Sequence, residues 1–454
     1  MTRSPPTSRT MLILVSGAIL VVLVLIVAGR IMAGPGPMDF ASGARVDLAS
    51  YPSPSPTGVP PELADADQVT RGKYLATAAD CVACHTAKGG RPFAGGLAFN
   101  LPFGTIYAPN ITPDRETGIG DWTDEEFLNA VHQGIGRDGT RLYPAFPYTS
   151  FTLLSDADVL AIKAYLFSLP PARNLVPATT LSFPYNQRWQ MAIWSYLFNT
   201  SGRYRPNLDQ SPEWNRGAYL AEGLAHCGEC HTPRNLLQAV DNRRKYAGAV
   251  AAGWRAYNIT GDKPTGIADW SDADLAQYLS SGHADGHGTS SGPMAEAVDL
   301  SLRNLTPGDI HALVVYLRSI PGIPSPDTPP LRTVAAPDTP TPDTAGTDPL
   351  GQKIFEGACI GCHSWSGAGT LTPYATLTAA RAVNDPSANN ITQIVLSGTR
   401  RQSLGSTVFM PAFGNDYSDT EIAAVANYVT ARFGAAPSNI TSEAIAGLRQ
   451  QSSK

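Results

Sequence analysis

The chain has few charged residues and no cysteine outside one recurring motif. Lysine, arginine, aspartate and glutamate make up 16% of its 454 residues, below the roughly one quarter that is usual, and the formal net charge is -5. This balance leaves no basic surface, which excludes a nucleic-acid-binding protein. The sequence also lacks a glycine-rich phosphate loop between a strand and a helix, and it has no readable Ser-His-Asp arrangement. Nucleotide-dependent and serine-hydrolase chemistry are therefore not expected of this chain.

All 6 cysteines lie in three copies of Cys-x-x-Cys-His, at residues 81–85, 227–231 and 359–363. In this motif two thiols add to the vinyl groups of one haem, and the adjacent imidazole takes an axial position on its iron. A zinc ribbon needs two Cys-x-x-Cys pairs close together, and these pairs lie far apart. The sequence therefore predicts three covalently bound haem c groups, held by Cys81, Cys84, Cys227, Cys230, Cys359 and Cys362, with His85, His231 and His363 as iron ligands.

Each motif belongs to a repeated unit. A glycine precedes it, at Gly72, Gly217 and Gly351. Each unit closes on a helix that begins with a capping box, at Ser155–Asp158, Thr306–Asp309 and Ser418–Glu421. Two helical turns past each acid lies a tyrosine, at Tyr165, Tyr316 and Tyr428, which we expect to pack as a core residue on the same helix face. The repeats predict an all-α fold: three class-I-like cytochrome c domains in series behind an N-terminal transmembrane helix.

The predicted domains are 67–182, 213–320 and 348–435, and the remaining segments connect them. Residues 11–29 are apolar apart from Ser16 and follow two arginines, so we expect 1–33 to be a membrane anchor rather than a cleaved signal peptide. The arginines would then place the haem domains in the periplasm of a bacterial cell, outside the inner membrane. Proline-rich linkers are expected at 34–66 and 321–347, and a tail at 436–454. The segment 183–212 is an aromatic connection that either wraps the first two domains or docks a partner.

A haem that only carries electrons normally has both axial positions filled, and a thioether opposite histidine raises its potential. One methionine stands in the expected stretch of the second unit, Met294, and one in the third, Met410. We expect both to be sixth ligands of iron.

The first unit departs from this pattern. Its equivalent stretch, residues 142–148, carries Phe146, and no methionine occurs between Met38 and Met191. His132 is the other histidine of the unit and is expected on a helix surface. The first haem is therefore predicted to be five-coordinate or to take a ligand from elsewhere, with a potential below that of the other two.

A loop that is shared by the first two units has two interpretations. It carries Asn110 and Trp122 in one unit and Asn258 and Trp270 in the other. These side chains either bind haem propionates or structure a loop that packs under the haem.

Residues 68–435 resemble the triheme cytochrome c subunits of membrane-bound periplasmic dehydrogenases. The resemblance rests on the three motifs and on the blocks at 110–122, 142–145 and 410–414. It implies an electron-transfer subunit that accepts electrons from a catalytic partner oxidising alcohols, aldehydes or sugar acids such as gluconate, and passes them to ubiquinone or an oxidase. The N-terminal anchor and segment 183–189 favour a molybdopterin-type aldehyde dehydrogenase, with an iron–sulfur subunit, as that partner.

No catalytic residue and no substrate site are expected on the chain itself. Two other functions stay open: a tethered electron shuttle or oxidase subunit, and a haem enzyme that acts at an open first haem.

Overall fold

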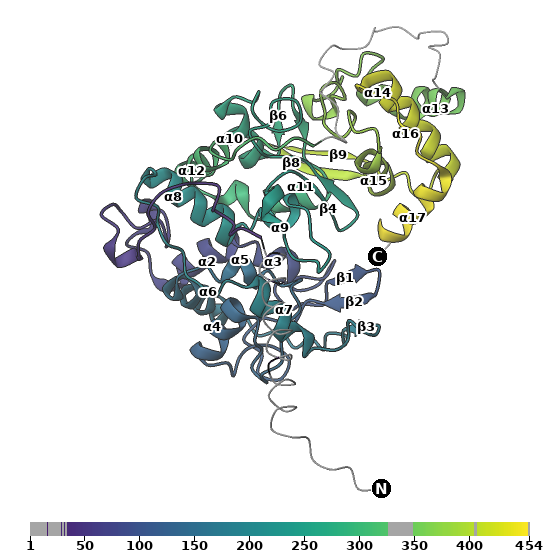
Figure 1. The fold of residues 1–454 in the computed structure, drawn as a ribbon. Helices are drawn as coiled ribbons and strands as arrows, with labels where there is room; N and C mark the ends of the chain where they lie inside the picture. The colour runs from purple at the N-terminus through teal and green to yellow at the C-terminus, as the bar shows by residue number, and fades with distance from the viewer. Residues whose placement is uncertain are drawn as a thin grey trace.

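The computed structural model describes residues 34–325, 348–403 and 406–452, together with Ser16, Gly29 and Ile31. Within these residues, helices carry most of the regular structure, and one three-stranded and three two-stranded antiparallel sheets accompany them (Figure 1). The predicted all-α fold is therefore wrong, and the fold is mixed. The strands are only two to five residues long, too short for a clear alternation of apolar and polar residues to mark them in the sequence.

The first unit holds the largest sheet. Its elements are α2 (Gln68–Ala78), α3 (Cys81–Cys84), β1 (Ala98–Leu101), β2 (Gly104–Tyr107), α4 (Asp124–Gln133), α5 (Tyr148–Phe151), α6 (Asp156–Ser168) and β3 (Thr180–Leu181). Strand β2 lies in the middle of the sheet, between β1 and β3.

The second unit repeats this order with smaller sheets. Its elements are α8 (Pro212–Ala218), α9 (Gly228–His231), β4 (Ala249–Ala251), β5 (Trp254–Ala256), α10 (Asp272–Ser281), β6 (His283–Ala284), β7 (Gly288–Thr289), α11 (Gly292–Leu300) and α12 (Pro307–Arg318).

The third unit adds a longer hairpin and an extra C-terminal helix. Its elements are α13 (Pro349–Ile354), α14 (Ile360–His363), α15 (Asn389–Ser397), β8 (Thr399–Ser403), β9 (Ser406–Met410), α16 (Asp419–Phe433) and α17 (Ser442–Ser452).

In every unit the first helix crosses the closing helix at a glycine. A Cβ atom would lie 1.8, 1.9 and 2.1 Å from a carbonyl oxygen of the closing helix if it were added to Gly72, Gly217 and Gly351. The same added atoms would lie 3.0, 2.8 and 2.8 Å from the Cβ atoms of Tyr165, Tyr316 and Tyr428. The tyrosines therefore pack at the crossing, as the spacing predicts, and no residue larger than glycine fits between the helices.

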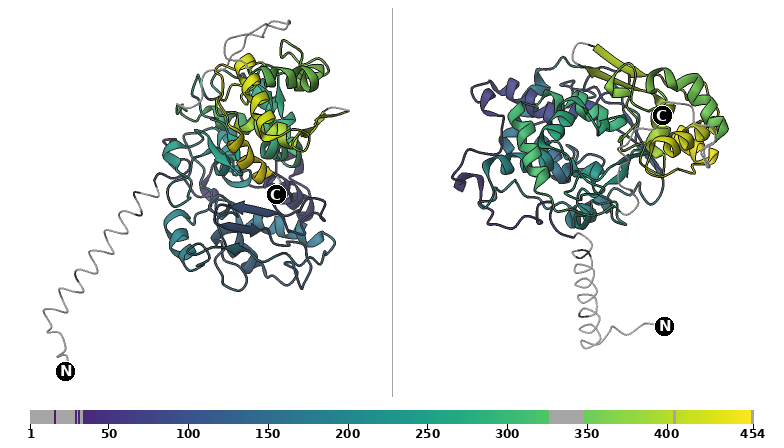
Figure 2. Two further views of the ribbon diagram at one scale, coloured as in Figure 1. Left: turned by 90° about the vertical axis from the view of Figure 1, so that its right-hand side faces the viewer. Right: turned by 90° about the horizontal axis from the view of Figure 1, so that it is seen from above.

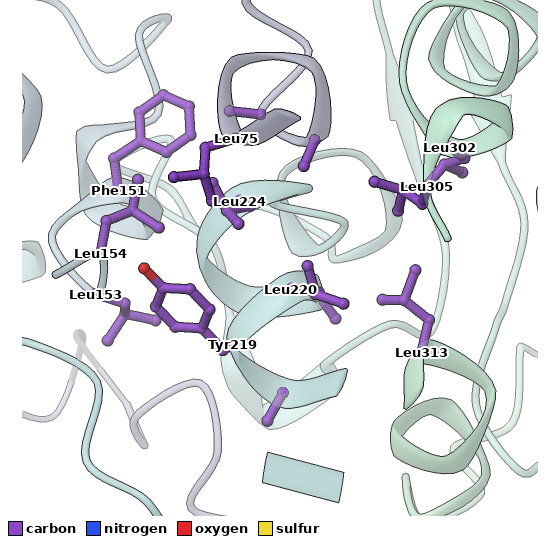
Figure 3. Close-up of a cluster of buried hydrophobic side chains, with 14 of the residues drawn as sticks. Leu75, Phe151, Leu153, Leu154, Tyr219, Leu220, Leu224, Leu302, Leu305 and Leu313 are labelled. Atoms are coloured by element: carbon purple, nitrogen blue, oxygen red, sulfur yellow. The ribbon is translucent and has the colours of Figure 1, made fainter. Parts of the chain in front are cut away.

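The first two units share one hydrophobic core. Figure 3 shows Leu75 and Leu154 of the first unit in the same cluster as Tyr219, Leu220 and Leu313 of the second. Leu75, Tyr219 and Leu220 have no solvent exposure. The third unit has a core of its own around Phe355 and Tyr428.

Two buried hydrogen bonds tie the first two units together reciprocally. The hydroxyl of Tyr74 in α2 donates to Asp309 at the start of α12, at 2.6 Å. The hydroxyl of Tyr219, directly after α8, donates to Asp158 at the start of α6, at 2.5 Å. Both tyrosines lie two residues after the crossing glycine of their unit, so the contact has an approximate twofold symmetry.

These bonds change the predicted capping boxes. Ser155 and Thr306 cap their helices, but the acid of each box bonds to the other unit instead of reaching back to its own cap. The box at Ser418 and Glu421 is complete, and the third unit has Lys353 where the others have tyrosine. The third unit therefore has no tyrosine hydroxyl at this position that could donate to the helix-start acid of another unit.

The third unit lies against the second (Figures 1 and 2), and its hairpin lies beside α11 in Figure 1. Hydrogen bonds from the hairpin and to it join the two units. Arg401 in β8 is 1% exposed and donates hydrogen bonds to the carbonyl oxygens of Ala295 and Ser281, each at 2.8 Å. Its guanidinium also forms an ion pair with Asp299 at 3.1 Å. The predicted linker 321–347 lies outside the described residues from position 326 onward.

The aromatic connection contains α7 (Gln190–Phe198) and has two different faces. Trp194 is buried, and its indole N–H donates to the carbonyl oxygen of Leu237 in the second unit at 2.8 Å. Trp189, Ile193 and Tyr196 are 65%, 55% and 64% exposed. One face thus wraps the first two units together, and the other presents aromatic side chains to solvent.

The predicted membrane anchor is not supported. In the part of the chain that the structure describes, no helix combines the length and the apolar character that a membrane span requires. The stretch 11–29 lies outside that part, except for Ser16 and Gly29. The transmembrane helix and the inner-membrane location with a single N-terminal anchor are corrected on this finding.

Candidate haem sites

The three motif histidines are held in one orientation. The Nδ1 atoms of His85, His231 and His363 lie 2.8, 2.7 and 2.6 Å from the carbonyl oxygens of Pro109, Tyr257 and Ala375, respectively. A carbonyl oxygen only accepts hydrogen bonds, so Nδ1 carries the proton and Nε2 keeps a free lone pair. This is the arrangement that orients a metal-bound imidazole. Burial lowers the pKa of all three histidines, which favours the neutral form that binds iron.

The short sheets supply two of these carbonyl groups. Pro109 follows β2, and Tyr257 directly follows β5. Ala375 instead ends the 3-10 turn Pro373–Ala375. The hairpins β1–β2 and β4–β5, which the sequence analysis did not predict, therefore position the carbonyl groups that orient His85 and His231.

The cysteines lie on short helical turns that follow the first helix of each unit. Positions i and i+3 of such a turn share a face, so both thiols of a motif face the same side. Burial raises the pKa of Cys81, Cys84 and Cys227 to about 12 and that of Cys359 to about 11. These thiols remain protonated at neutral pH, and the cysteines form no disulfide. A redox-active pair needs the opposite, a lowered pKa.

A cavity of about 700 Å³ opens beside the first motif. Cys81, Cys84 and His85 line it on one side, and apolar residues from α4 and α6, such as Phe127 and Ile162, line it elsewhere. Both thiols and the histidine thus face one largely apolar space. The residues present fit a covalently attached haem, whose bound iron would supply one-electron redox chemistry.

The predicted sixth ligands lie in the expected units. Met294 is half-buried in the first turn of α11 and packs against the shared core. Met410 is half-buried at the end of β9. Their ligation of iron stays a prediction.

His132 has a different place from the one expected. It is 1% exposed, so the expectation of a surface histidine is wrong. It does not line the cavity, although its neighbours Ala130 and Val131 do. Burial lowers the pKa of His132 to about 4, which keeps the ring neutral.

The shared asparagine loop has a structural role. The Asn110 side chain donates to Thr117 Oγ1 and the Ala172 carbonyl oxygen and accepts from Thr112. Asn258 makes the matching bonds in the second unit. Because these bonds occupy both amides, the interpretation as a structured loop is favoured over propionate binding for the asparagines.

The first two haem motifs are neighbours, which the sequence did not indicate. The pKa of Cys84 is raised by burial first, and the groups close enough to raise it further include Cys230 of the second motif. Phe151 lines the first cavity, and its ring lies 5.5 Å from the ring of His226, directly before Cys227. No sequence signal relates α5 to a motif about 80 residues later.

These features together define a c-type cytochrome. Each Cys-x-x-Cys-His turn has an imidazole that is oriented by a carbonyl oxygen, and each follows a helix that crosses the closing helix at a glycine. A family model described as cytochrome c matches residues 69–170 and 350–432, which include the first and third motifs. These domains imply covalently bound haem c.

The chain belongs to the family of cytochrome subunits of dehydrogenase complexes. It is 38% identical to the fructose dehydrogenase cytochrome subunit of Gluconobacter japonicus, over 87% of this chain and 85% of that protein. It is 36% identical to the gluconate 2-dehydrogenase cytochrome c subunit of Pantoea cypripedii, over 84% and 89%. It is also 42% identical to a nicotinate dehydrogenase subunit of Pseudomonas putida over 82% of this chain, which spans 31% of that longer protein.

Proposed function

We propose that this protein carries three haem c groups and passes electrons from the catalytic subunit of a dehydrogenase to ubiquinone or another acceptor of the respiratory chain. The observation that carries the proposal is the threefold repetition of one histidine geometry, at His85, His231 and His363. Three imidazoles with free Nε2 atoms, each beside two cysteines, provide three equivalent attachment sites.

The proposal assigns a role to each predicted site residue. The thiols of Cys81, Cys84, Cys227, Cys230, Cys359 and Cys362 hold the haems, and Met294 and Met410 complete the second and third iron sites. The division into haem domains 67–182, 213–320 and 348–435 is part of the same proposal. The proximity of the first two motifs supports electron exchange between those two haems.

The catalytic partner follows from the family. The relatives are cytochrome subunits of dehydrogenases named for fructose and gluconate, and one is a subunit of nicotinate dehydrogenase. We propose a molybdopterin-type catalytic subunit with an iron–sulfur subunit, of which aldehyde dehydrogenase is the first candidate. Segment 183–189 supports this choice, whereas the anchor that also favoured it is not supported.

Haem counting tests the proposal directly. Pyridine haemochrome analysis of the purified protein should give three covalently held haems per chain, and two after Cys359→Ala with Cys362→Ala. Fewer than three in the unmodified protein would overturn the proposal.

Isolation of the native complex tests the partner. A molybdopterin dehydrogenase should co-purify with the cytochrome, and its substrate should reduce all haems. Purification without any dehydrogenase, together with reduction by a generic quinol, would favour the electron shuttle or oxidase subunit instead.

A further inference from the structure

The first haem cavity contains a single histidine and no methionine. Among the side chains that line it, His85 is the sole imidazole, and neither a methionine nor a lysine is present. Phe146 lines the same cavity, and its ring lies 5.4 Å from that of Phe151. A phenylalanine ring has no atom that can bind iron, so Phe146 supplies no ligand to the cavity.

Apart from Tyr107, whose phenol also lines the cavity, the nearby groups that could replace a methionine are engaged elsewhere. Tyr143 lines the cavity, but its hydroxyl donates to the carbonyl oxygen of Tyr185 at 3.0 Å. Met191 of α7 packs in the cluster around Tyr148 and Trp194 and does not line the cavity. His132 is buried outside the cavity lining.

Each charged group of the cavity wall has a polar partner of its own. Arg137 lies 3.5 Å from Glu126, and Arg188 donates to the carbonyl oxygen of Arg141 at 2.8 Å. Asp138 accepts from Thr140. The remaining wall is mostly apolar, which favours a small neutral ligand over an anion.

We propose that the first haem site keeps an exchangeable sixth position, because Phe146 replaces a ligand, and that it binds neutral diatomic molecules such as carbon monoxide. The inference rests on the proposed function, since it requires a haem at the first motif. Binding forms one coordinate bond to reduced iron and moves no electron between partners.

Carbon monoxide titration of the dithionite-reduced, haem-loaded protein tests this inference. We expect one carbon monoxide per chain, measured by the change in the Soret band, and two haems that do not respond. Phe146→Met should supply a thioether, abolish binding and raise the potential of one haem. Phe103→Met is the matched control, because Phe103 stacks on Tyr185 in the same unit, outside the cavity lining. It should leave binding at one per chain.

The unmodified protein decides the question even if a variant fails to fold. No carbon monoxide binding by a protein with three haems would overturn this inference and leave the proposed function intact. Fewer than three haems would instead overturn the proposed function. A ferric spectrum that changes on Tyr107→Phe or on Tyr143→Phe would assign the sixth position to that phenol and also refute the inference.

Discussion

Removing the Tyr219 hydroxyl should destabilise the paired first two units more than removing the Tyr74 hydroxyl. Tyr219 is fully buried and donates to Asp158, which is 3% exposed. Burial and the charge of Asp158 raise the pKa of Tyr219, so the hydroxyl keeps its proton and remains a donor. Asp158 also accepts from the Gly58 backbone amide at 2.8 Å, and no ion pair with this carboxylate is found in the described chain.

Asp309 is better supplied with donors. It accepts from Tyr74 and from two nitrogen atoms of Arg216, at 2.8 and 2.7 Å. Loss of a hydrogen bond to a buried charge costs about 1.5–3 kcal/mol. We therefore expect Tyr219→Phe to lower the free energy of unfolding by about 3 kcal/mol and Tyr74→Phe by about 1.5 kcal/mol, because Arg216 still compensates Asp309.

Native-state hydrogen exchange of the haem-loaded protein measures both costs locally. Peptides from α2, α6, α8 and α12 should lose protection, and those from α16 should not, because the third unit has a separate core. Tyr165→Phe is the control, since its hydroxyl makes no hydrogen bond within the described chain. A double-mutant cycle of Tyr219→Phe with Asp158→Asn should show coupling above about 1 kcal/mol. Equal costs for the two tyrosines, or no coupling, would refute the reasoning.

Three further perturbations test other parts of the structure. Arg401→Met should weaken the docking of the third unit by roughly 3 kcal/mol and increase the radius of gyration in X-ray scattering. Arg400→Met, at the neighbouring position of the same strand, is the control and should have no such effect. An unchanged radius in both variants would contradict the docking contact. Because the pKa of His132 is lowered to about 4 in the folded state, the unfolded chain takes up this proton first as the pH falls. The free energy of unfolding should therefore decrease by roughly 2–3 kcal/mol between about pH 6.5 and about pH 4. In urea unfolding, His132→Gln should make this pH dependence flatter. Met294→Leu and Met410→Leu should each lower the potential of one haem in a redox titration, and an unchanged potential would remove that residue as a ligand.

Sequence reasoning reached the parts of the site that are local. The cysteines and histidine of a motif are adjacent in the chain, so their chemistry is visible without a structure. The tyrosines of the closing helices were also predicted to pack, because helical periodicity relates each one to its capped helix start. The hairpins after the first two motifs were missed, although they carry the carbonyl groups that orient His85 and His231.

The sequence by itself determined that this protein has three Cys-x-x-Cys-His motifs in three repeated units, each with a tyrosine on its closing helix, because these features depend on residues within a few turns of one another. Only the tertiary structure decided how the units associate. Asp158 and Asp309 look like ordinary capping acids in the sequence, yet each accepts from a tyrosine 61 or 235 positions away. Long-range pairing of this kind depends on how the cores meet, and no local pattern records it.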